Sequence, residues 1–501
     1  GAALRPPLRG GGGGGGRRDG VSGARYDAAV VGGGPVGAAA ALAFARRGAR
    51  VLLLEANPAA ATRLAGEWLH PPGVDALARL GVDVLADGEG PTAGRGFAVF
   101  PDDGSDPVVL PYPDGLRGAS IEHHALVALV RARACAHPGV DFRPGARVTA
   151  VEDGRLTYEE KSNGHAGAAV TVEAARIVGA DGRTSVVRRA LGFADDANPM
   201  SSMAGVELRG VTLPFEGYGH VVLGGPGPVL MYRIGPDRAR ACLDVPHGAD
   251  GRPRRDAAAL WGAFSPVLPA QVLPAFRAAL DERRVAWAGI AFRPRAHYGR
   301  GAVALAGDAV GYFHPMTAAG MSLGIVDAER VAAGGDVEDY GREREAESYV
   351  PELLACGLYQ ALTRRDPSGV AIRAAVYRLW RASDAERQRT MRILACAETR
   401  PDQFRGAFNA LALELVRGTA RGWRAFPAAL GLLREWIRWP VASILPGALR
   451  RAYRAQSTPA HPLASREART ATDSRDARDA RDMRDVRGAR DAQGDERRGA
   501  P

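Results

Sequence analysis

Lysine is almost absent from this chain of 501 residues: Lys161 is the only one, and arginine supplies the rest of the positive charge. Such a bias is typical of a coding composition rich in alanine, glycine and arginine. The formal net charge of +10 is therefore weak support for a nucleic-acid partner. No basic run interleaved with aromatic residues strengthens that reading, so we expect no nucleic acid to bind.

Cysteine is also scarce, and the four cysteines are widely spaced: Cys135, Cys242, Cys356 and Cys396. No C-x-x-C pair occurs, so the sequence indicates neither a zinc site nor a redox dithiol, and we expect no metal. Apolar runs of the length of a membrane span are missing. The glycine-rich beginning contains no apolar core of a signal peptide. These absences favour a cytoplasmic protein.

A glycine-rich turn is the most informative feature that is present. Residues 28–31 predict a buried strand, the turn G-G-G-P-V-G follows at 32–37, and an alanine-rich helix is expected over 38–46. A second apolar strand at 51–54 then ends at Glu55. This order of strand, turn, helix, strand and carboxylate is the one that a dinucleotide site requires.

Each residue of this motif has a chemical reason to be there. Gly32 would permit the tight turn, and Gly34 would let the backbone approach a pyrophosphate at the helix N-terminus. Gly37 would let the helix pack closely on the strand, and Glu55 can accept hydrogen bonds from a ribose. The motif therefore predicts a dinucleotide-binding site.

Two later motifs narrow the cofactor to a flavin. At residues 178–188, V-G-A-D-G-R-T-S-V-V-R, Asp181 opens a turn and Ser185 can cap a helix. At residues 302–308 an apolar strand ends in Gly-Asp, and a helix of small residues is expected about ten residues later. Asp308 can hold ribityl hydroxyls, and that helix N-terminus can face the flavin edge that gains negative charge on reduction. Either motif alone could be a helix cap and a turn, but the three in this order indicate FAD.

The pattern along the chain predicts a mixed α/β fold: a Rossmann-like FAD-binding domain with an inserted β-rich substrate domain and a helical C-terminal region. The predicted ranges are a disordered leader over 1–24, the FAD-binding domain over 25–95, 119–200 and 285–345, the β-rich domain over 96–118 and 201–284, the helical region over 346–455, and a disordered Arg/Asp tail over 456–501. His123 and His124 are expected to precede a helix, and Ser383 with Glu386 predicts a capping box.

Together the motifs resemble the FAD-dependent monooxygenases of the aromatic-hydroxylase superfamily, and within it the squalene epoxidase (squalene monooxygenase) family. The carriers are R-L-A-G-E-W-L-H-P-P-G at 63–73, L-P-Y-P at 110–113, P-V-L-M-Y at 228–232, H-P-M-T-A-A-G-M at 314–321 and A-S-D at 382–384. Beside Gly32, Gly34, Gly37, Glu55, Asp181 and Asp308, the resemblance implies FAD contacts from Pro35, Val36, Ala56, Arg63, Trp68, Arg131, Arg147 and Met321.

Three departures from the family pattern concern the substrate pocket. His70 stands where the family usually has Gln, Phe97 where it has Tyr, and Ala318-Ala319 where it has Gly-Gly. His70 is then a candidate proton donor or hydrogen-bond anchor, or else a pocket-wall histidine whose bonds are satisfied. We expect Phe97 to deprive residue 70 of a polar partner, and Phe97→Tyr to be tolerated. No side chain is assigned as catalytic, because the flavin carries the chemistry.

The resemblance implies an enzyme that inserts one oxygen atom of O2 into an apolar polyene or terpenoid, with squalene epoxidation to 2,3-oxidosqualene as the first choice. No second dinucleotide motif is present, so electrons are expected from NADPH through a partner reductase. Alternatives are a flavin-dependent prenyl-lipid reductase, an aromatic or polyketide hydroxylase, and a flavoprotein that binds lipid without turnover. Residues 423–449, with three tryptophans, suit either an interfacial helix or a helix packed on the core; the interfacial reading implies peripheral attachment at the cytoplasmic face of a membrane.

Overall fold

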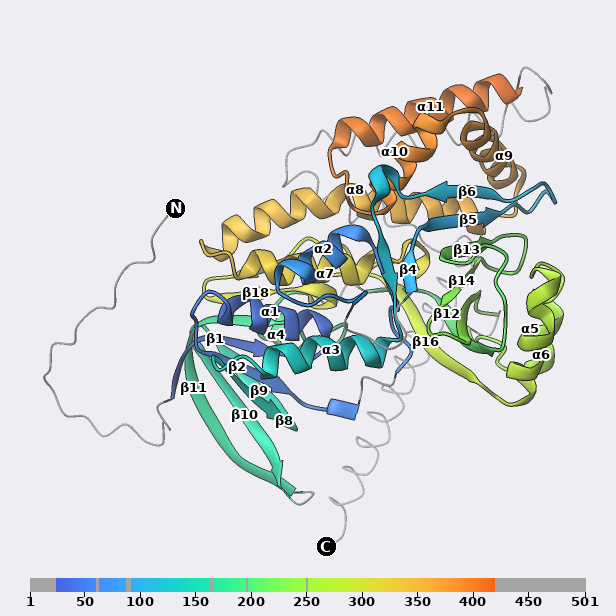
Figure 1. Ribbon diagram of the computed structural model, residues 1–501. Coiled ribbons are helices and arrows are strands. Elements are labelled where there is room, and N and C mark those ends of the chain that lie inside the picture. Colours follow the sequence, from blue (N-terminus) through green and yellow to red (C-terminus); the bar gives the residue numbers. More distant parts are fainter. Residues whose placement is uncertain are drawn as a thin grey trace, which may run out of the picture.

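The computed structural model describes residues 24–59, 63–86, 92–162, 165–194, 197–248 and 251–419. Figure 1 shows two large sheets side by side, with a layer of helices across one end of both. The predicted mixed α/β fold is confirmed. The leader, the tail and the predicted interfacial segment at 423–449 lie outside the described residues.

The first sheet is the nucleotide-binding half of the molecule. Its strands run in the order β17-β18-β11-β1-β2-β8, with β10 and β9 added beside β11. Their bounds are β1 Arg25–Val31, β2 Val51–Glu55, β8 Val140–Pro144, β9 Ala146–Glu152, β10 Arg155–Ser162, β11 His165–Gly179, β17 Gly299–Arg300 and β18 Val303–Leu305. The strands from β18 to β8 are parallel to one another. Strands buried on both faces are apolar throughout, which explains the unbroken apolar runs at 28–31 and 51–54.

Helices cover this sheet and carry the cofactor motifs. They are α1 Pro35–Ala45, α2 Pro71–Arg79, α3 His123–Cys135, α4 Val186–Ala190 and α7 Ala319–Val331. Helix α1 packs against both α3 and α7, and α2 packs against α7. All but a few residues of α1 are buried, because its alanine-rich face lets neighbouring elements approach closely.

The second sheet forms the β-rich half, in the order β16-β12-β15-β14-β13-β5-β6. Its strands are β5 Gly96–Phe100, β6 Val108–Pro111, β12 Asn198–Arg209, β13 Tyr218–Val222, β14 Val229–Arg233, β15 Arg238–Val245 and β16 Val285–Phe292. Helices α5 Ala257–Phe264 and α6 Leu273–Asp281 pack on its outer face. Its other face contributes to a core shared with the nucleotide-binding half and the C-terminal helices.

Two boundaries predicted between the FAD-binding domain and the β-rich domain differ from those in the structure by one strand each. Strand β16 was assigned to the FAD-binding domain from residue 285, but it pairs with β12 and belongs to the second sheet. Strand β12 already begins at Asn198, inside the range predicted for the FAD-binding domain. A small third sheet, β3-β7-β4, lies between the halves and consists of β3 Trp68–Leu69, β7 Gly118–Ser120 and β4 Thr92–Gly94. Short 3-10 turns are η2 Pro113–Gly115, η3 Ala270–Val272, η4 Gly307–Ala309 and η5 Pro315–Thr317.

The C-terminal helices are α8 Val337–Thr363, α9 Pro367–Ala382, α10 Asp384–Leu394 and α11 Pro401–Thr419. The predicted capping box between α9 and α10 is half formed. Ser383 Oγ accepts the Glu386 N–H at 3.3 Å, but the Ser383 N–H donates to Leu379 and the Glu386 carboxylate pairs with Arg389 instead. Within the described part of the chain, no helix is both long and apolar enough to span a bilayer.

A buried ion pair attaches these helices to the hairpin β5–β6. Asp102 Oδ2 accepts hydrogen bonds from Arg373 Nε at 2.9 Å and Nη2 at 2.7 Å, and its Oδ1 accepts one from the Tyr377 hydroxyl at 2.9 Å. Both residues of the pair are mostly buried. The helical region is thereby fixed to the β-rich half from one side.

Candidate flavin site

The glycine turn has the geometry that the sequence predicted. Gly32 has a φ of +103°, and a Cβ there would lie 2.4 Å from the Ala180 carbonyl oxygen. A Cβ on Gly37 would lie 1.8 Å from the Gly32 carbonyl oxygen. A Cβ on Gly34 would meet nothing within 4 Å, although Gly34 caps the N-terminus of α1. Two of the glycines are therefore required by packing, and the third leaves open space where a phosphate could approach the helix.

Two predicted cofactor residues hold the peptide groups of Gly33. Glu55 Oε2 accepts the Gly33 N–H at 2.7 Å, and Glu55 Oε1 accepts the Asn57 N–H at 2.7 Å. Arg131 of α3 donates from Nε at 3.0 Å and from Nη2 at 2.6 Å to the Gly33 carbonyl oxygen. Each carboxylate oxygen keeps further acceptor capacity for a ribose. Ala56, which follows Glu55, is exposed.

The first and third motifs meet at Val36, the residue after Pro35 at the start of α1. A Cβ on Gly324 of α7 would lie 2.7 Å from Val36 Cγ2, and one on Gly307 of η4 would lie 3.2 Å from the Val36 methyls. Gly307 has a φ of +64°. The start of α1 is thus wedged between the Gly-Asp turn and the flavin-facing helix, which brings motifs nearly 300 residues apart into one place.

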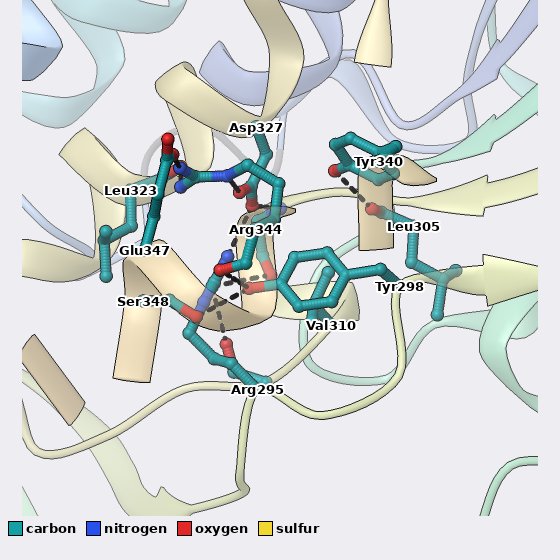
Figure 2. A network of polar contacts seen from close by, with 12 residues as sticks. Arg295, Tyr298, Leu305, Val310, Leu323, Asp327, Tyr340, Arg344, Glu347 and Ser348 are labelled. Atoms are coloured by element: carbon teal, nitrogen blue, oxygen red, sulfur yellow. Dashed lines mark hydrogen bonds and ion pairs between the residues drawn. The ribbon is translucent and has the colours of Figure 1, made fainter. Parts of the chain in front are cut away.

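A buried polar network fixes the Gly307 turn (Figure 2). Asp327 of α7 accepts the Gly307 N–H at 2.9 Å and is paired with Arg295 and with Arg344 of α8. Arg295 also donates to the carbonyl oxygens of Gly307 at 3.2 Å and Gly311 at 3.1 Å. Asp327 and Arg295 therefore hold the loop that carries Asp308, and Arg344 in turn holds Asp327.

Asp308 itself lies at the mouth of a pocket. Arg183 Nε is 3.3 Å from Asp308 Oδ2, and Arg183 Nη1 donates to the Gly289 carbonyl oxygen of β16 at 3.0 Å. The Arg183 guanidinium carbon lies 4.9 Å from the ring centre of Tyr312. More than a third of both charged side chains is exposed, so the carboxylate remains accessible to a hydroxyl ligand. Sequence reasoning did not single out Arg183.

The pocket lies between α7 and the inner face of the second sheet. Its apolar wall includes Leu64, Trp68, Met203, Leu230, Ile290, Phe313 and Met316. Its polar lining includes Glu67, Arg183, Tyr232, Cys242, Asp308 and His314. The start of α7 completes it through Ala318, Gly320 and Met321, and a Cβ on Gly320 would meet nothing within 4 Å. Open space at the N-termini of both α1 and α7 fits a cofactor whose pyrophosphate lies at the first helix end and whose electron-accepting ring lies at the second.

Residues 25–334 match the family described as FAD binding domain. The chain belongs to this family of FAD-binding proteins. The match spans all three motifs, from the glycine turn at 32–37 through residues 178–188 to the segment 302–321.

Curated relatives are squalene epoxidases. The chain is 28% identical over 315 residues to squalene epoxidase 1 of Arabidopsis thaliana, covering 60% of this chain and 57% of that protein. It is 28% identical over 379 residues to squalene epoxidase erg1 of Aspergillus fumigatus, covering 66% and 74%. It is 25% identical over 372 residues to squalene monooxygenase of Mus musculus, covering 70% and 64%. The family resemblance is confirmed, although the chain spans less than two thirds of the length of the Arabidopsis relative.

Solved structures share the fold. A p-nitrophenol 4-monooxygenase from Pseudomonas putida aligns with a TM-score of 0.58 at 20% identity, over 77% of this chain and 98% of that one. A probable FAD-dependent monooxygenase from Pseudomonas aeruginosa, PqsL, aligns with a TM-score of 0.54 at 21% identity, over 74% and 99%.

In this FAD-binding fold, His70 is a satisfied core residue. It is completely buried, and its Nε2 lies 2.7 Å from the carbonyl oxygen of Thr317. Because that carbonyl can only accept, Nε2 carries the proton and Nδ1 accepts a hydrogen bond from the Tyr112 hydroxyl at 2.6 Å. Tyr112 in turn accepts from Trp68 Nε1 at 3.0 Å. Burial lowers the pKa of His70 to about 4, against the opposing effect of the bond to Thr317.

Of the two interpretations of His70, the structure favours the histidine whose hydrogen bonds are satisfied: both nitrogens are engaged, which leaves no free donor for a substrate. Its position differs from a pocket wall, because it is not among the residues that line the pocket. The expectation for Phe97 is wrong. Phe97 does not leave residue 70 without a polar partner, because Tyr112 of the L-P-Y-P motif provides one. Phe97 instead packs between Trp68 and His70, with ring centres 5.2 Å and 5.9 Å away.

Other predicted residues have local roles. The carboxylate of Asp181 accepts from Ser185 Oγ at 2.5 Å and the Val186 N–H at 2.7 Å, so it starts helix α4, and burial raises its pKa. Arg63 lines a second, polar pocket next to the first. Arg147 is exposed on β9. Helix α3 begins at His123, so this residue does not precede the helix as expected. His123 is buried, with Nδ1 3.0 Å from the Gly66 carbonyl oxygen.

A buried acid–base pair in the pocket wall was missed. Glu67 Oε1 lies 2.9 Å from Arg240 Nη2, Glu67 Oε2 lies 3.0 Å from Arg240 Nε, and the Tyr232 hydroxyl donates to Oε2 at 3.3 Å. Glu67 stands in the R-L-A-G-E-W motif and Tyr232 ends the P-V-L-M-Y motif, so the motifs contained both. No spacing in the sequence indicates that β15, which carries Arg240, passes beside them.

Proposed function

We propose that the chain is an FAD-dependent monooxygenase that inserts one atom of O2 into an apolar polyene or terpenoid, with squalene as the first substrate to test. The observation that carries this proposal is the pocket itself. A largely apolar wall faces the N-terminus of α7, which is where the flavin ring of the family would lie. Support also comes from relatives that are named squalene epoxidases.

Bound FAD, once reduced, supplies the activated oxygen, and the chain's own residues supply the surroundings. Asp308 and the peptide groups around Gly34 would hold the cofactor, and Met321 would lie against its ring. The apolar side chains Leu230, Ile290 and Phe313 exclude water, which protects a reactive oxygen species from discharge before transfer. The positive end of α7 favours negative charge at the adjacent ring edge.

The partners of this proposal follow from the same features. Reducing equivalents come from NADPH through a separate reductase, because the chain shows one dinucleotide fingerprint and the FAD occupies it. A substrate with no polar groups resides in lipid, so we propose that the protein works peripherally at the cytoplasmic face of a membrane.

The test is an assay of the FAD-loaded full chain with NADPH, a reductase and squalene under 18O2. We expect 2,3-oxidosqualene that carries one labelled oxygen atom.

Leu230→Trp, which fills the pocket, should abolish product while the bound flavin remains; Leu268→Phe, under α5 and away from the pocket lining, is the matched control. Saturation of double bonds without oxygen uptake would identify a prenyl-lipid reductase instead. If no polyene accelerates the reoxidation of the reduced flavin, the chain is a flavoprotein that binds lipid without turnover.

A further inference from the structure

A carboxylate and an imidazole meet behind the polar end of the pocket. His314 Nε2 lies 3.3 Å from Asp244 Oδ1, and each side chain is only 1% exposed. His314 lines the pocket and opens the segment 314–321 that leads into α7. Asp244 lies on β15 two residues after Cys242, which also lines the pocket, so both side chains face the same side of the sheet.

The orientation of the His314 ring is fixed on three sides. Its Nδ1 accepts the Met316 N–H at 3.3 Å. In the neutral ring the proton therefore resides on Nε2, the nitrogen beside Asp244. The ring stacks on Tyr359 of α8, with ring centres 4.2 Å apart and planes inclined by 29°. Three parts of the molecule, the second sheet, α8 and the flavin-facing turn, thus converge on one imidazole.

The surroundings of Asp244 leave its charge to His314. Neither carboxylate oxygen accepts a hydrogen bond from any residue that the structure describes, and His314 Nε2 donates none, so the two side chains meet at ion-pair distance without a hydrogen bond. On the other side the backbone closes in, since a Cβ on Gly227 would lie 2.7 Å from Asp244 Oδ2. A fully buried carboxylate without a proton or a paired cation is strongly destabilising. His314 is the one group at ion-pair distance in the described part of the chain.

We propose that the buried contact between Asp244 and His314, a couple at ion-pair distance, fixes the turn that aims α7 at the pocket. His314 contacts the pocket directly, and Asp244 is a positioning residue that acts through it. Without Asp244, the imidazole that accepts the Met316 N–H is no longer held in place, and the turn through Thr317 and Ala318 loosens. The distance between the flavin-facing helix and the second sheet is then no longer set.

The consequence for turnover rests on the proposed function. Each O2 takes two electrons, from a reduced nicotinamide by way of FAD, and two protons. In coupled turnover one oxygen atom enters the alkene and the other leaves as water. In uncoupled turnover both atoms leave as hydrogen peroxide and the alkene is unchanged. A loosened turn admits water to the pocket and shifts turnover to the second outcome.

The first experiment is independent of any substrate. The full chain with FAD is labelled with 15N-histidine, and the imidazole resonances of the parent, Asp244→Asn, His314→Gln and His220→Gln are compared by NMR. We expect the His314 imidazole resonances, identified by their loss in His314→Gln, to shift in Asp244→Asn and to keep their positions in His220→Gln. His220 is the matched control, since it is buried in the second sheet and does not line the pocket. His314 resonances that keep their positions in Asp244→Asn would overturn the couple.

The second experiment measures the ratio of oxidosqualene formed to nicotinamide consumed. Asp244→Asn should keep its FAD and its oxygen consumption, but lower this ratio by about 10- to 100-fold, the range that a displacement of about 1 Å can cost. Hydrogen peroxide should rise to match, and His220→Gln should leave the ratio unchanged. An unchanged ratio in Asp244→Asn would refute the positioning role. If the parent forms no oxidosqualene, the proposed substrate fails, while the NMR comparison still decides the couple.

Discussion

The Tyr112 hydroxyl donates a hydrogen bond to His70 Nδ1 across 2.6 Å. The imidazole is therefore held neutral between a phenol on one side and the Thr317 carbonyl on the other. Since Thr317 precedes the left-handed Ala318 at the start of α7, this pair supports the flavin-facing turn from α2 and the small third sheet. His70 thus supports the turn and does not line the pocket.

Tyr112→Phe should destabilise the protein, because it leaves both the Nδ1 of His70 and the Nε1 of Trp68 without a partner. We expect the free energy of unfolding to fall by about 2–4 kcal/mol, because each of the two buried polar groups left without a partner costs roughly 1–3 kcal/mol. Phe97→Tyr should also cost stability, since no free nitrogen remains on His70 to receive the new hydroxyl. Urea unfolding measures both. If Phe97→Tyr stabilises the protein, a polar group beside residue 97 must be able to pair with the new hydroxyl.

The stability of the protein should fall as pH falls from about 7 to 5. Burial lowers the pKa values of His70 and His220 to about 4, whereas an exposed histidine titrates near 6.5. The unfolded chain therefore gains protons in this window before the folded chain does, and unfolding is favoured at the lower pH. Each residue accounts for roughly 2 kcal/mol at pH 5. His220→Gln should reduce the loss between pH 7 and pH 5 by about that amount, and an unchanged loss would contradict the low pKa.

Two alanine substitutions in the glycine turn should have opposite effects on folding and binding. Gly37→Ala places a Cβ 1.8 Å from the Gly32 carbonyl oxygen and should unfold or aggregate the nucleotide-binding half. Gly34→Ala meets no protein atom within 4 Å, so it should fold with parental thermal stability and yet bind FAD more weakly. Thermal unfolding of the flavin-free protein and FAD titration separate the two. Full FAD affinity in Gly34→Ala would place the pyrophosphate elsewhere.

Asp308→Ala should strip most of the FAD, because the carboxylate at the pocket mouth is lost while the loop itself stays fixed by Asp327. Arg183→Gln, which removes the partner of Asp308, is the matched control and should keep most of its flavin. Absorbance of the purified proteins near the flavin maximum measures the content. Equal flavin loss in both variants would indicate that the ion pair, and not the carboxylate, supports the cofactor.

Asp102→Asn should cost about 2–4 kcal/mol, since it leaves the buried Arg373 guanidinium without its counter-charge. Burial alone would raise the pKa of Asp102, but the hydrogen bonds and charge of Arg373, with the bond from Tyr377, lower it. The contribution is thus present above pH ~4 and is lost as the pH falls through the lowered value. Asp103→Asn, at the neighbour whose carboxylate accepts from Ser105 in the same turn, should cost no more than about 1 kcal/mol. Equal effects of the two would contradict a role for the pair.

The features that could be predicted from the sequence are those that depend on residues close together in the chain. The glycine turn, Glu55 and the Gly-Asp turn were readable because strand, turn and helix lie next to one another in the chain. The network around Asp327, and the pairs Glu67–Arg240 and Asp244–His314, join elements far apart in the chain, and no periodicity records which strands become neighbours. The hydrogen-bond partner of His70 could not be predicted for the same reason. Its partner Tyr112 stood in a recognised motif, but the distance between two motifs is a tertiary property.

The pairing of β1 with β11 and of β11 with β18 has a consequence for biosynthesis. The strand that opens the glycine turn borders a strand made about 150 residues later, and the Gly-Asp turn follows roughly 270 residues after β1. At about 5–20 residues per second, the ribosome reaches that turn some 15–60 seconds after the first strand. A nascent chain that stops before β18 would carry the complete fingerprint and still be colourless. Acquisition of the flavin is therefore a late event in synthesis, and its yellow colour would report that β18 has paired with β11.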